Sequence, residues 1–252
     1  MSTNVKRNAR IFAFRLLVME IRILHLLEGA KMAEGLTVVI DVFRAFSLAC
    51  YMADKGAAEI IPVSDINKAY DLKSKIPNSI LVGERNERVP EGFDFGNSPT
   101  HILHENIEGK IIIHTTSAGT QGLVNATKAS ERITGSFVNA PAIVSYIKAK
   151  NPGIVSLVCM GYSMKYPTEE DTFCAEYIKQ CLQGETPNTA EMIETIKNTS
   201  AQRLFNPANQ EFSPSSDFYF CTQIGKFNFV LKAEEIDGLL KLRKIESKDF
   251  IR

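Results

Sequence analysis

The sequence lacks an excess of charge of either sign. Its 252 residues carry 29 lysines and arginines against 29 aspartates and glutamates, so the formal net charge is +0. Without residues 1–18, which hold four basic residues and no acid, 25 basic side chains face 29 acidic ones. A basic face is the footprint of nucleic-acid binding, and this balance argues against such a partner. The hydrophobic content of 44% is enough for a sizeable core, in one domain or two lobes.

The sequence also lacks the cysteine pattern of a thiolate metal site. Its five cysteines are an odd number, and no two form a Cys-x-x-Cys pair. Most of them lie in apolar runs, as expected for reduced, buried thiols in a cytosolic protein. We therefore predict a cytoplasmic location and no metal-thiolate site.

No hydrophobic run is long and uninterrupted enough for a membrane span. Residues 9–27 are apolar but contain five charged or polar side chains that a spanning helix of about 20 residues does not tolerate well. One of them, Arg15, also cuts short the apolar core of a signal peptide. We interpret residues 1–18 as a dispensable extension and residues 19–252 as the folded domain, opening on an alternating strand. The five interruptions are Arg10, Arg15, Glu20, Arg22 and His25.

Apolar, β-branched runs alternate with helical patterns, and no fixed-period repeat is present. This alternation predicts a layered α/β/α fold with a largely parallel or mixed sheet. The fold is expected to form either one body or two lobes. After Gly184 the pattern weakens and predicts no order of elements. A strand is predicted from Met19, where Ile21 and Ile23 alternate with polar residues, and further strands are predicted at 36–40, 59–63, 79–82, 110–114, 131–134 and 154–159. Helices are predicted at 44–54, 65–75, 120–129 and 139–151, from Pro99, and after Thr168 in a capping-box pattern.

Four short polar motifs lie where predicted strands end or helices begin, at residues 41–44, 83–85, 92–99 and 115–120. Carboxyl ends of parallel strands share one edge of a sheet, where ligands bind. We expect the carboxylates, arginines, hydroxyls and glycines of these motifs to converge on one pocket. That mixture suits a divalent cation and a phosphate.

Asp41 ends a predicted strand, and Arg44 begins the next helix. A carboxylate in this position can hold Mg²⁺ or act as a nucleophile. The haloacid-dehalogenase pattern Asp-x-Asp is excluded, because Phe43 occupies its second acidic position. The alternative is a helix-capping aspartate with Arg44 as its ion-pair partner.

Glu84 and Arg85 follow an apolar run directly. Adjacent opposite charges are common on surfaces, so the pair alone says little. Gly83 before them indicates a tight turn that presents both side chains at the sheet edge. Arg85 is suited to fork onto phosphate or sulfonate oxygens.

The two remaining motifs are loops. Residues 92–99 place Asp94 between two phenylalanines and two glycines, which indicates either a specific site or an Asx-turn that leads into a helix cap. Residues 115–120 supply four hydroxyls and one glycine before a predicted helix, a combination that binds anions. There is no Gly-Lys-Ser/Thr, so this loop is not a P-loop. Ordinary capping needs fewer hydroxyls, which favours an anion site.

Other polar residues give weaker signals. Of the acids at 169–171, at most one is expected as a metal ligand, because acids are common at helix N-termini. His101 and His104 share a predicted helix face but lack a third ligand for zinc. His114 is a weak acid–base candidate beside the hydroxyl loop.

Together and in this order, the motifs resemble the 2-phosphosulfolactate phosphatase (ComB-like) family over roughly residues 20–230. The run Gly-Phe-Asp-Phe-Gly-Asn-Ser-Pro at 92–99 is the most specific part. The resemblance implies Mg²⁺-dependent hydrolysis of (R)-2-phospho-3-sulfolactate to 3-sulfolactate and phosphate, in coenzyme M biosynthesis. In one departure, Ala118 stands where the family has asparagine, which puts the substrate in question more than the fold.

The sequence and the resemblance together lead to a set of expected roles. The catalytic candidates are Asp41, Arg44, Glu84 and Asp94. The Mg²⁺ ligands are expected to be Asp41, Glu84, Asp94 and Asp171. The substrate-binding candidates are Arg85, Asn97, Ser98, Thr115, Thr116, Ser117, Gly119 and Thr120.

Three readings of these residues stay open. The first is a phosphatase for a small anionic phosphomonoester, in which either a carboxylate or an activated water attacks phosphorus. The second is a binding protein that retains the pocket but does not turn over a substrate. Ala118 is the residue on which this second interpretation depends. The third is a structural protein in which the motifs are only caps and ion pairs. The expected partner is a phosphorylated small molecule, with no nucleic acid or membrane; a homo-oligomer is left open.

Overall fold

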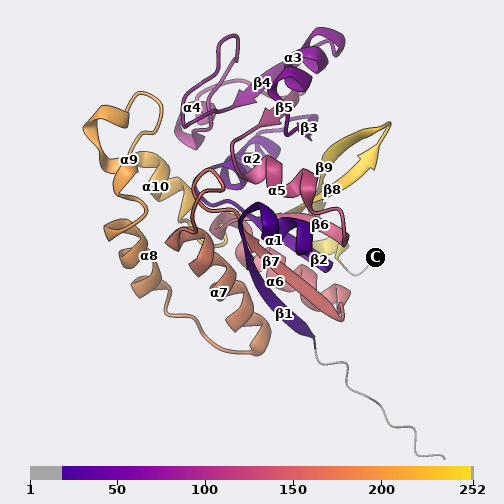
Figure 1. Cartoon of the computed structure of the whole chain (residues 1–252), viewed down its shortest axis with the longest axis vertical. Coiled ribbons are helices and arrows are strands. Elements are labelled where there is room, and N and C mark those ends of the chain that lie inside the picture. The colour runs from indigo at the N-terminus through magenta and orange to yellow at the C-terminus, as the bar shows by residue number, and fades with distance from the viewer. Residues whose placement is uncertain (1–18, 251–252) are drawn as a thin grey trace, which may run out of the picture.

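The computed structural model describes residues 19–250, which form one nine-stranded sheet with helices packed on it (Figure 1). The strands are β1 (Glu20–His25), β2 (Gly35–Ile40), β3 (Glu59–Pro62), β4 (Ser79–Gly83), β5 (Ile111–Thr115), β6 (Ala129–Gly135), β7 (Ile154–Cys159), β8 (Phe229–Ile236) and β9 (Leu239–Glu246). The helices are α1 (Leu26–Met32), α2 (Ala45–Asp54), α3 (Ile66–Lys75), α4 (Pro99–Leu103), α5 (Gly119–Asn125), α6 (Ala140–Lys150), α7 (Glu169–Gln183), α8 (Thr189–Asn198), α9 (Gln202–Phe205) and α10 (Ser216–Cys221). Short 3-10 turns lie at Phe137–Asn139, Pro207–Asn209 and Ser247–Asp249.

The sheet consists of two parallel blocks joined by an antiparallel hairpin. Its strand order is β1-β7-β2-β6-β8-β9-β3-β5-β4. Strands β1, β7, β2 and β6 run parallel to one another, as do β3, β5 and β4. The hairpin β8–β9 pairs with β6 over two residue pairs and with β3 over one. It is therefore the only strand-to-strand link between the blocks in the described part of the chain.

Both faces of each block are buried. Successive strand residues point to opposite sides of a sheet, so neighbouring residues of one strand pack in different cores. Val39 of β2 packs with α2 and α5 in a central core, together with Ile112 of β5. Figure 1 shows these two helices between the blocks. Val38, on the opposite face of β2, packs with α6 and α7. Ile113, on the outer face of β5, packs with α3. This layering brings strand ends of both blocks to the same region.

The predicted α/β class and mixed sheet are confirmed. Two local predictions are wrong: α5 ends at Asn125, so Ala129 begins a strand instead of ending a helix, and the Thr168 hydroxyl caps nothing. The predicted extension, residues 1–18, lies outside the described residues. Across residues 19–250, no helix combines the length and apolarity that crossing a bilayer requires.

Candidate active site

A partly open pocket lies where strand ends from both blocks meet. The loops after β2, β4, β5 and β7 contribute to its wall, and α9 adds one side chain. Its polar character comes from three carboxylates and two arginines. The lining residues are Asp41, Phe43, Arg44, Glu84, Glu87, Asn97, Ser117, Ala118, Gly161, Tyr162, Ser163 and Arg203.

Asp41 connects the two blocks at the floor of the pocket. Its Oδ1 accepts a hydrogen bond from the Ala45 backbone N–H at 3.1 Å, and its Oδ2 accepts one from the Gly119 N–H at 2.8 Å. A Cβ at residue 119 would lie 2.8 Å from that Oδ2, so only glycine permits this approach. Burial raises the pKa of Asp41 to about 6, and the nearby charge of Glu84 adds to the shift.

Glu84 is bracketed by the loop that follows β5. Its Oε1 accepts from the Ser117 backbone N–H at 2.6 Å, and its Oε2 accepts from the Ser117 hydroxyl at 3.0 Å and from the Glu87 N–H at 2.8 Å. Gly83 has φ +147°, and a Cβ there would lie 1.8 Å from the Thr115 carbonyl oxygen. The strand end can therefore pack this closely only with glycine, and the carboxylate is held in one orientation.

Two arginines face these carboxylates. Arg44 is 3% exposed, and its Nη1 donates to Asp217 Oδ2 at 2.7 Å and to the Phe212 carbonyl at 2.9 Å. Arg203 comes from α9 and pairs with Glu87. Its Nη2 lies 3.6 Å from Glu170 Oε1. The pocket therefore carries two positive charges that neighbouring acids hold in place.

Glu170 is a buried carboxylate next to Arg203. It is 2% exposed, and its Oε2 has no hydrogen-bond partner among the described residues. Its negative charge is also among the causes that raise the pKa of Asp41. The carboxylates at and behind the pocket therefore outnumber its two arginines.

The hydroxyl loop 115–120 uses most of its groups internally. The Thr120 hydroxyl accepts from the Thr116 backbone N–H at 2.8 Å, and the Thr116 hydroxyl accepts from the Thr120 N–H at 3.2 Å. Thr115 Oγ1 accepts from Arg85 Nη2 at 2.7 Å. Arg85 also donates to the Glu84 and Ser64 carbonyls, so it ties the loops together and is not among the lining residues. Of this motif, only Ser117 and Ala118 line the pocket.

The expected cluster of four carboxylate ligands is not formed. No three His, Cys, Asp or Glu side chains within residues 19–250 are placed to hold one metal ion. Asp94 lies beside β4, where its Oδ2 accepts from the Leu81 N–H at 2.8 Å and from Lys73 Nζ at 3.3 Å. Asp171 is buried with both oxygens on backbone N–H groups, of Val42 and Gly161, each at 2.8 Å. Both aspartates fasten loops, and neither lines the pocket.

Asn97 and Ser98 separate although they are adjacent. Asn97 lines the pocket, and its Oδ1 lies 3.4 Å from Nε2 of the fully buried His114. Ser98 points away and donates to Asp217 at 2.8 Å. Burial lowers the pKa of His114 to about 4, so this ring is neutral at physiological pH. His114 lies behind Asn97 and is not a lining residue, a placement that does not suit an acid–base group.

Residues 22–235 match the sequence profile described as 2-phosphosulpholactate phosphatase. The chain belongs to this family.

Three relatives illustrate the similarity, each named a probable 2-phosphosulfolactate phosphatase. The Bacillus subtilis (strain 168) protein is 33% identical over 207 residues, covering 81% of this chain and 88% of its own. The Caldanaerobacter subterraneus protein is 30% identical over 237 residues, covering 89% and 95%. The Thermotoga petrophila protein is 37% identical over 166 residues, covering 64% and 71%. The resemblance inferred from the motifs is confirmed.

In this 2-phosphosulpholactate phosphatase family member, the sequence motifs did not point to every pocket residue. Arg203, Tyr162 and Glu87 were missed, although all three line the pocket. Arg203 stacks over the Tyr162 ring at 5.2 Å, which orders its guanidinium. Its helix follows Gly184, where the hydrophobic pattern is weak, so no local signal marks it. Glu87 lies three residues after Glu84, in a segment that the sequence predicted only as a loop.

Proposed function

We propose that this chain is a Mg²⁺-dependent phosphatase that hydrolyses a small, multiply anionic phosphomonoester, 2-phosphosulfolactate, to 3-sulfolactate and phosphate. The observation that carries the proposal is a single pocket in which Asp41 and Glu84 lie with Arg44 and Arg203. The names of the relatives supply the identity of the substrate. Two fixed cations suit a substrate with a phosphate and a second anionic group.

The carboxylates fit one divalent cation. Mg²⁺ is usually held by one or two carboxylates, with waters and substrate phosphate oxygens completing its shell. Asp41 and Glu84 would hold it, because both line the pocket and the charge of Glu84 raises the pKa of Asp41. When bound, the ion would polarise the phosphoryl group and neutralise part of its charge.

Protein side chains would bind the substrate and assist the attack on phosphorus. Arg44 has free N–H groups to bind phosphoryl oxygens in a fork, and Arg203 is available to the second anionic group. Water adds across the P–O bond, so phosphate takes the water oxygen, and the alcohol keeps the ester oxygen and gains a proton. Ionised Asp41 either attacks phosphorus, displacing the alcohol and forming an acyl phosphate that water then hydrolyses, or takes a proton from a water that attacks phosphorus directly. Asn97, held by His114, is positioned to donate its amide N–H to a substrate oxygen.

The test is phosphate release from a panel of phosphomonoesters that includes 2-phosphosulfolactate, with Mg²⁺ and with chelator. We expect chelator-sensitive release that Asp41→Asn abolishes. Asp94→Asn is the matched control, because Asp94 belongs to the sequence motifs but lies outside the pocket. Equal loss in both variants would contradict this assignment of roles.

A binding protein without turnover is the second candidate, and Ala118 favours it. This residue lines the pocket with a methyl group where the family has an amide. Folded protein that binds Mg²⁺ and phosphate but releases phosphate from no ester would establish this candidate. Release from another ester alone would keep the chemistry and change the substrate.

A further inference from the structure

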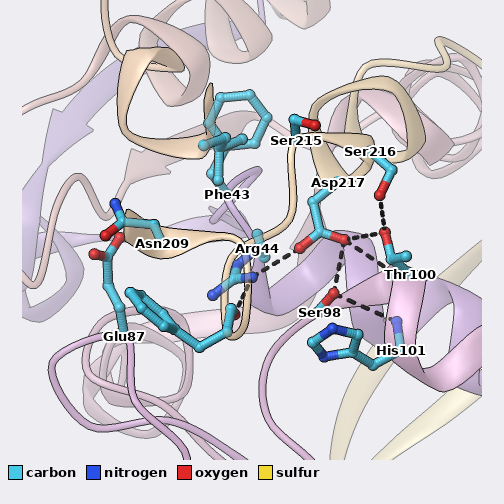
Figure 2. Close-up of polar contacts among 12 residues, drawn as sticks. Phe43, Arg44, Glu87, Ser98, Thr100, His101, Asn209, Ser215, Ser216 and Asp217 are labelled. Carbon is cyan, nitrogen blue, oxygen red and sulfur yellow. Dashed lines mark hydrogen bonds and ion pairs between the residues drawn. The ribbon is translucent and has the colours of Figure 1, made fainter. Parts of the chain in front are cut away.

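Asp217 is a fully buried carboxylate that no sequence motif includes. It lies in the first turn of α10, and four hydrogen bonds converge on it (Figure 2). Its Oδ1 accepts from Ser98 Oγ at 2.8 Å, from the Thr100 N–H at 3.0 Å and from Thr100 Oγ1 at 2.6 Å. Its Oδ2 accepts from Arg44 Nη1 at 2.7 Å. The carboxylate is therefore held from one side by the 92–100 segment and from the other by the pocket arginine.

The hydrogen bonds of Arg44 are confined to one nitrogen. Nη1 carries two N–H groups, and these donate to Asp217 and to the Phe212 carbonyl. A guanidinium has five N–H groups in a rigid plane, so fixing Nη1 fixes the direction of the three on Nη2 and Nε. Arg44 lines the pocket, and Figure 2 shows that its contacts with the drawn residues leave from one side of the guanidinium.

We propose that Asp217 is a positioning residue that aims Arg44 at the substrate phosphate, and that Ser98 and Thr100 act through Asp217. This inference rests on the proposed function, in which Arg44 binds phosphate. The pair has side-chain exposures of only 2% and 0%, so neither charge is compensated by solvent. The specific Asn-Ser-Pro-Thr run thus serves the site in two ways: Asn97 lines the pocket, and the next residues anchor the carboxylate that orients Arg44.

The alternative is an ion pair that only stabilises the fold. The two roles differ in what they predict for phosphate affinity in protein that is still folded. Asp217→Asn keeps the shape of the side chain but removes the charge. Ser98→Ala/Thr100→Val removes two of the three Oδ1 donors without changing a residue that lines the pocket.

Two controls separate orientation from stability. Ser216→Ala removes a hydroxyl that bonds to Thr100 Oγ1 at 2.8 Å and that is not among the donors to the Asp217 carboxylate. Leu72→Ala opens the small core between α3 and the outer face of β5, which contains no residue that lines the pocket, and measures the effect of destabilisation alone. Both variants should bind phosphate as the wild type does.

The measurement is the affinity for inorganic phosphate by calorimetry in Mg²⁺ buffer, together with KM and kcat on the best ester. Since a hydrogen bond to a charged group is at stake, Asp217→Asn should weaken phosphate binding about 10- to 100-fold and raise KM similarly. Ser98→Ala/Thr100→Val should shift both in the same direction by a smaller factor.

A folded Asp217→Asn protein with wild-type phosphate affinity and KM would overturn the inference and leave the proposed function standing. If that variant does not fold, the Ser98→Ala/Thr100→Val protein decides, and unchanged affinity there overturns the inference. Wild-type protein that neither binds phosphate nor releases it from any ester would overturn the proposed function, and the role of Arg44 with it.

Discussion

At the scale of single residues, two buried titratable groups have shifts that favour the neutral form. Burial raises the pKa of Asp41 to about 6 and lowers that of His114 to about 4. Asp41 faces the pocket, where a cation would relieve the cost of its charge. His114 faces only protein, including Asn97. The first shift therefore affects a group that lines the pocket, and the second affects a group that lies behind it.

Asp41→Asn should separate activity from stability. The folded state holds a proton on Asp41 that the unfolded chain releases between pH 3.8 and about 6, so the free energy of unfolding falls as pH rises through this window. Removing the charge should abolish phosphate release while the free energy of unfolding at pH 8 stays within about 1 kcal/mol or rises. Denaturant titration beside the activity assay checks this. A loss of several kcal/mol would mean that Asp41 is mainly a structural cap.

His114→Gln should change the acid side of the stability profile. The unfolded chain takes up a proton near pH 6.5 and the folded chain only near pH 4, so His114 costs about 3 kcal/mol of stability as pH falls through this range. The glutamine variant should lack that loss. Comparing the two proteins by denaturant titration at pH 4, 5, 6 and 7 isolates the effect, since the opposite contribution of Asp41 is common to both. Identical slopes would contradict a neutral, buried His114.

At the scale of elements, part of the pocket wall comes from a short helix that lies outside the sheet. Arg203 of α9 pairs with Glu87, and its Nη2 donates to the Phe43 carbonyl at 3.1 Å. These contacts connect α9 to the loops after β4 and β2. The same arginine lines the pocket, so α9 both contributes to its wall and supplies a charge to it.

Arg203→Gln should alter selectivity between substrates. Removing the guanidinium takes a charged hydrogen-bond donor from the second anionic group, so KM for 2-phosphosulfolactate should rise about 10-fold or more. KM for a phosphomonoester without a second anionic group should change much less. Steady-state kinetics on both esters gives the comparison, with each ester as the internal control for folding. An equal rise for both would show that Arg203 acts only on pocket structure.

At the scale of the whole molecule, the hairpin β8–β9 joins the two parallel blocks. Leu231 of β8 and Leu242 of β9 are buried in the central core with α2. That core also receives Val39 from one block and Ile112 from the other. Because Asp41 and Glu84 come from different blocks, the geometry of the pocket depends on this shared core.

Leu231→Ala should destabilise the whole molecule. Its side chain is fully buried, so truncation should lower the free energy of unfolding by about 2–5 kcal/mol. Ile236→Ala on the same strand is the control: that side chain is 37% exposed, and its loss should cost less than about 1 kcal/mol. Thermal and denaturant unfolding of both variants provide the measurement. Equal losses would indicate that the hairpin does not tie the core together.

The sequence by itself determined the alternation of elements, the α/β class and the family, because these follow from local periodicity and contiguous motifs. It placed Asp41 and Glu84 at strand ends, because an apolar strand that ends at an acidic residue can be recognised from a few consecutive residues. It also identified Gly83, which the close approach of Thr115 requires.

Only the tertiary structure decided which polar residues meet. Arg203 and Asp217 belong to helices after Gly184 that carry no motif, yet packing brings them to the pocket and to Arg44. Asp94 and Arg85 also belong to the sequence motifs, but they fasten loops outside the pocket. The physical reason is that a motif fixes local backbone shape, whereas the direction of a side chain depends on how distant segments pack against it.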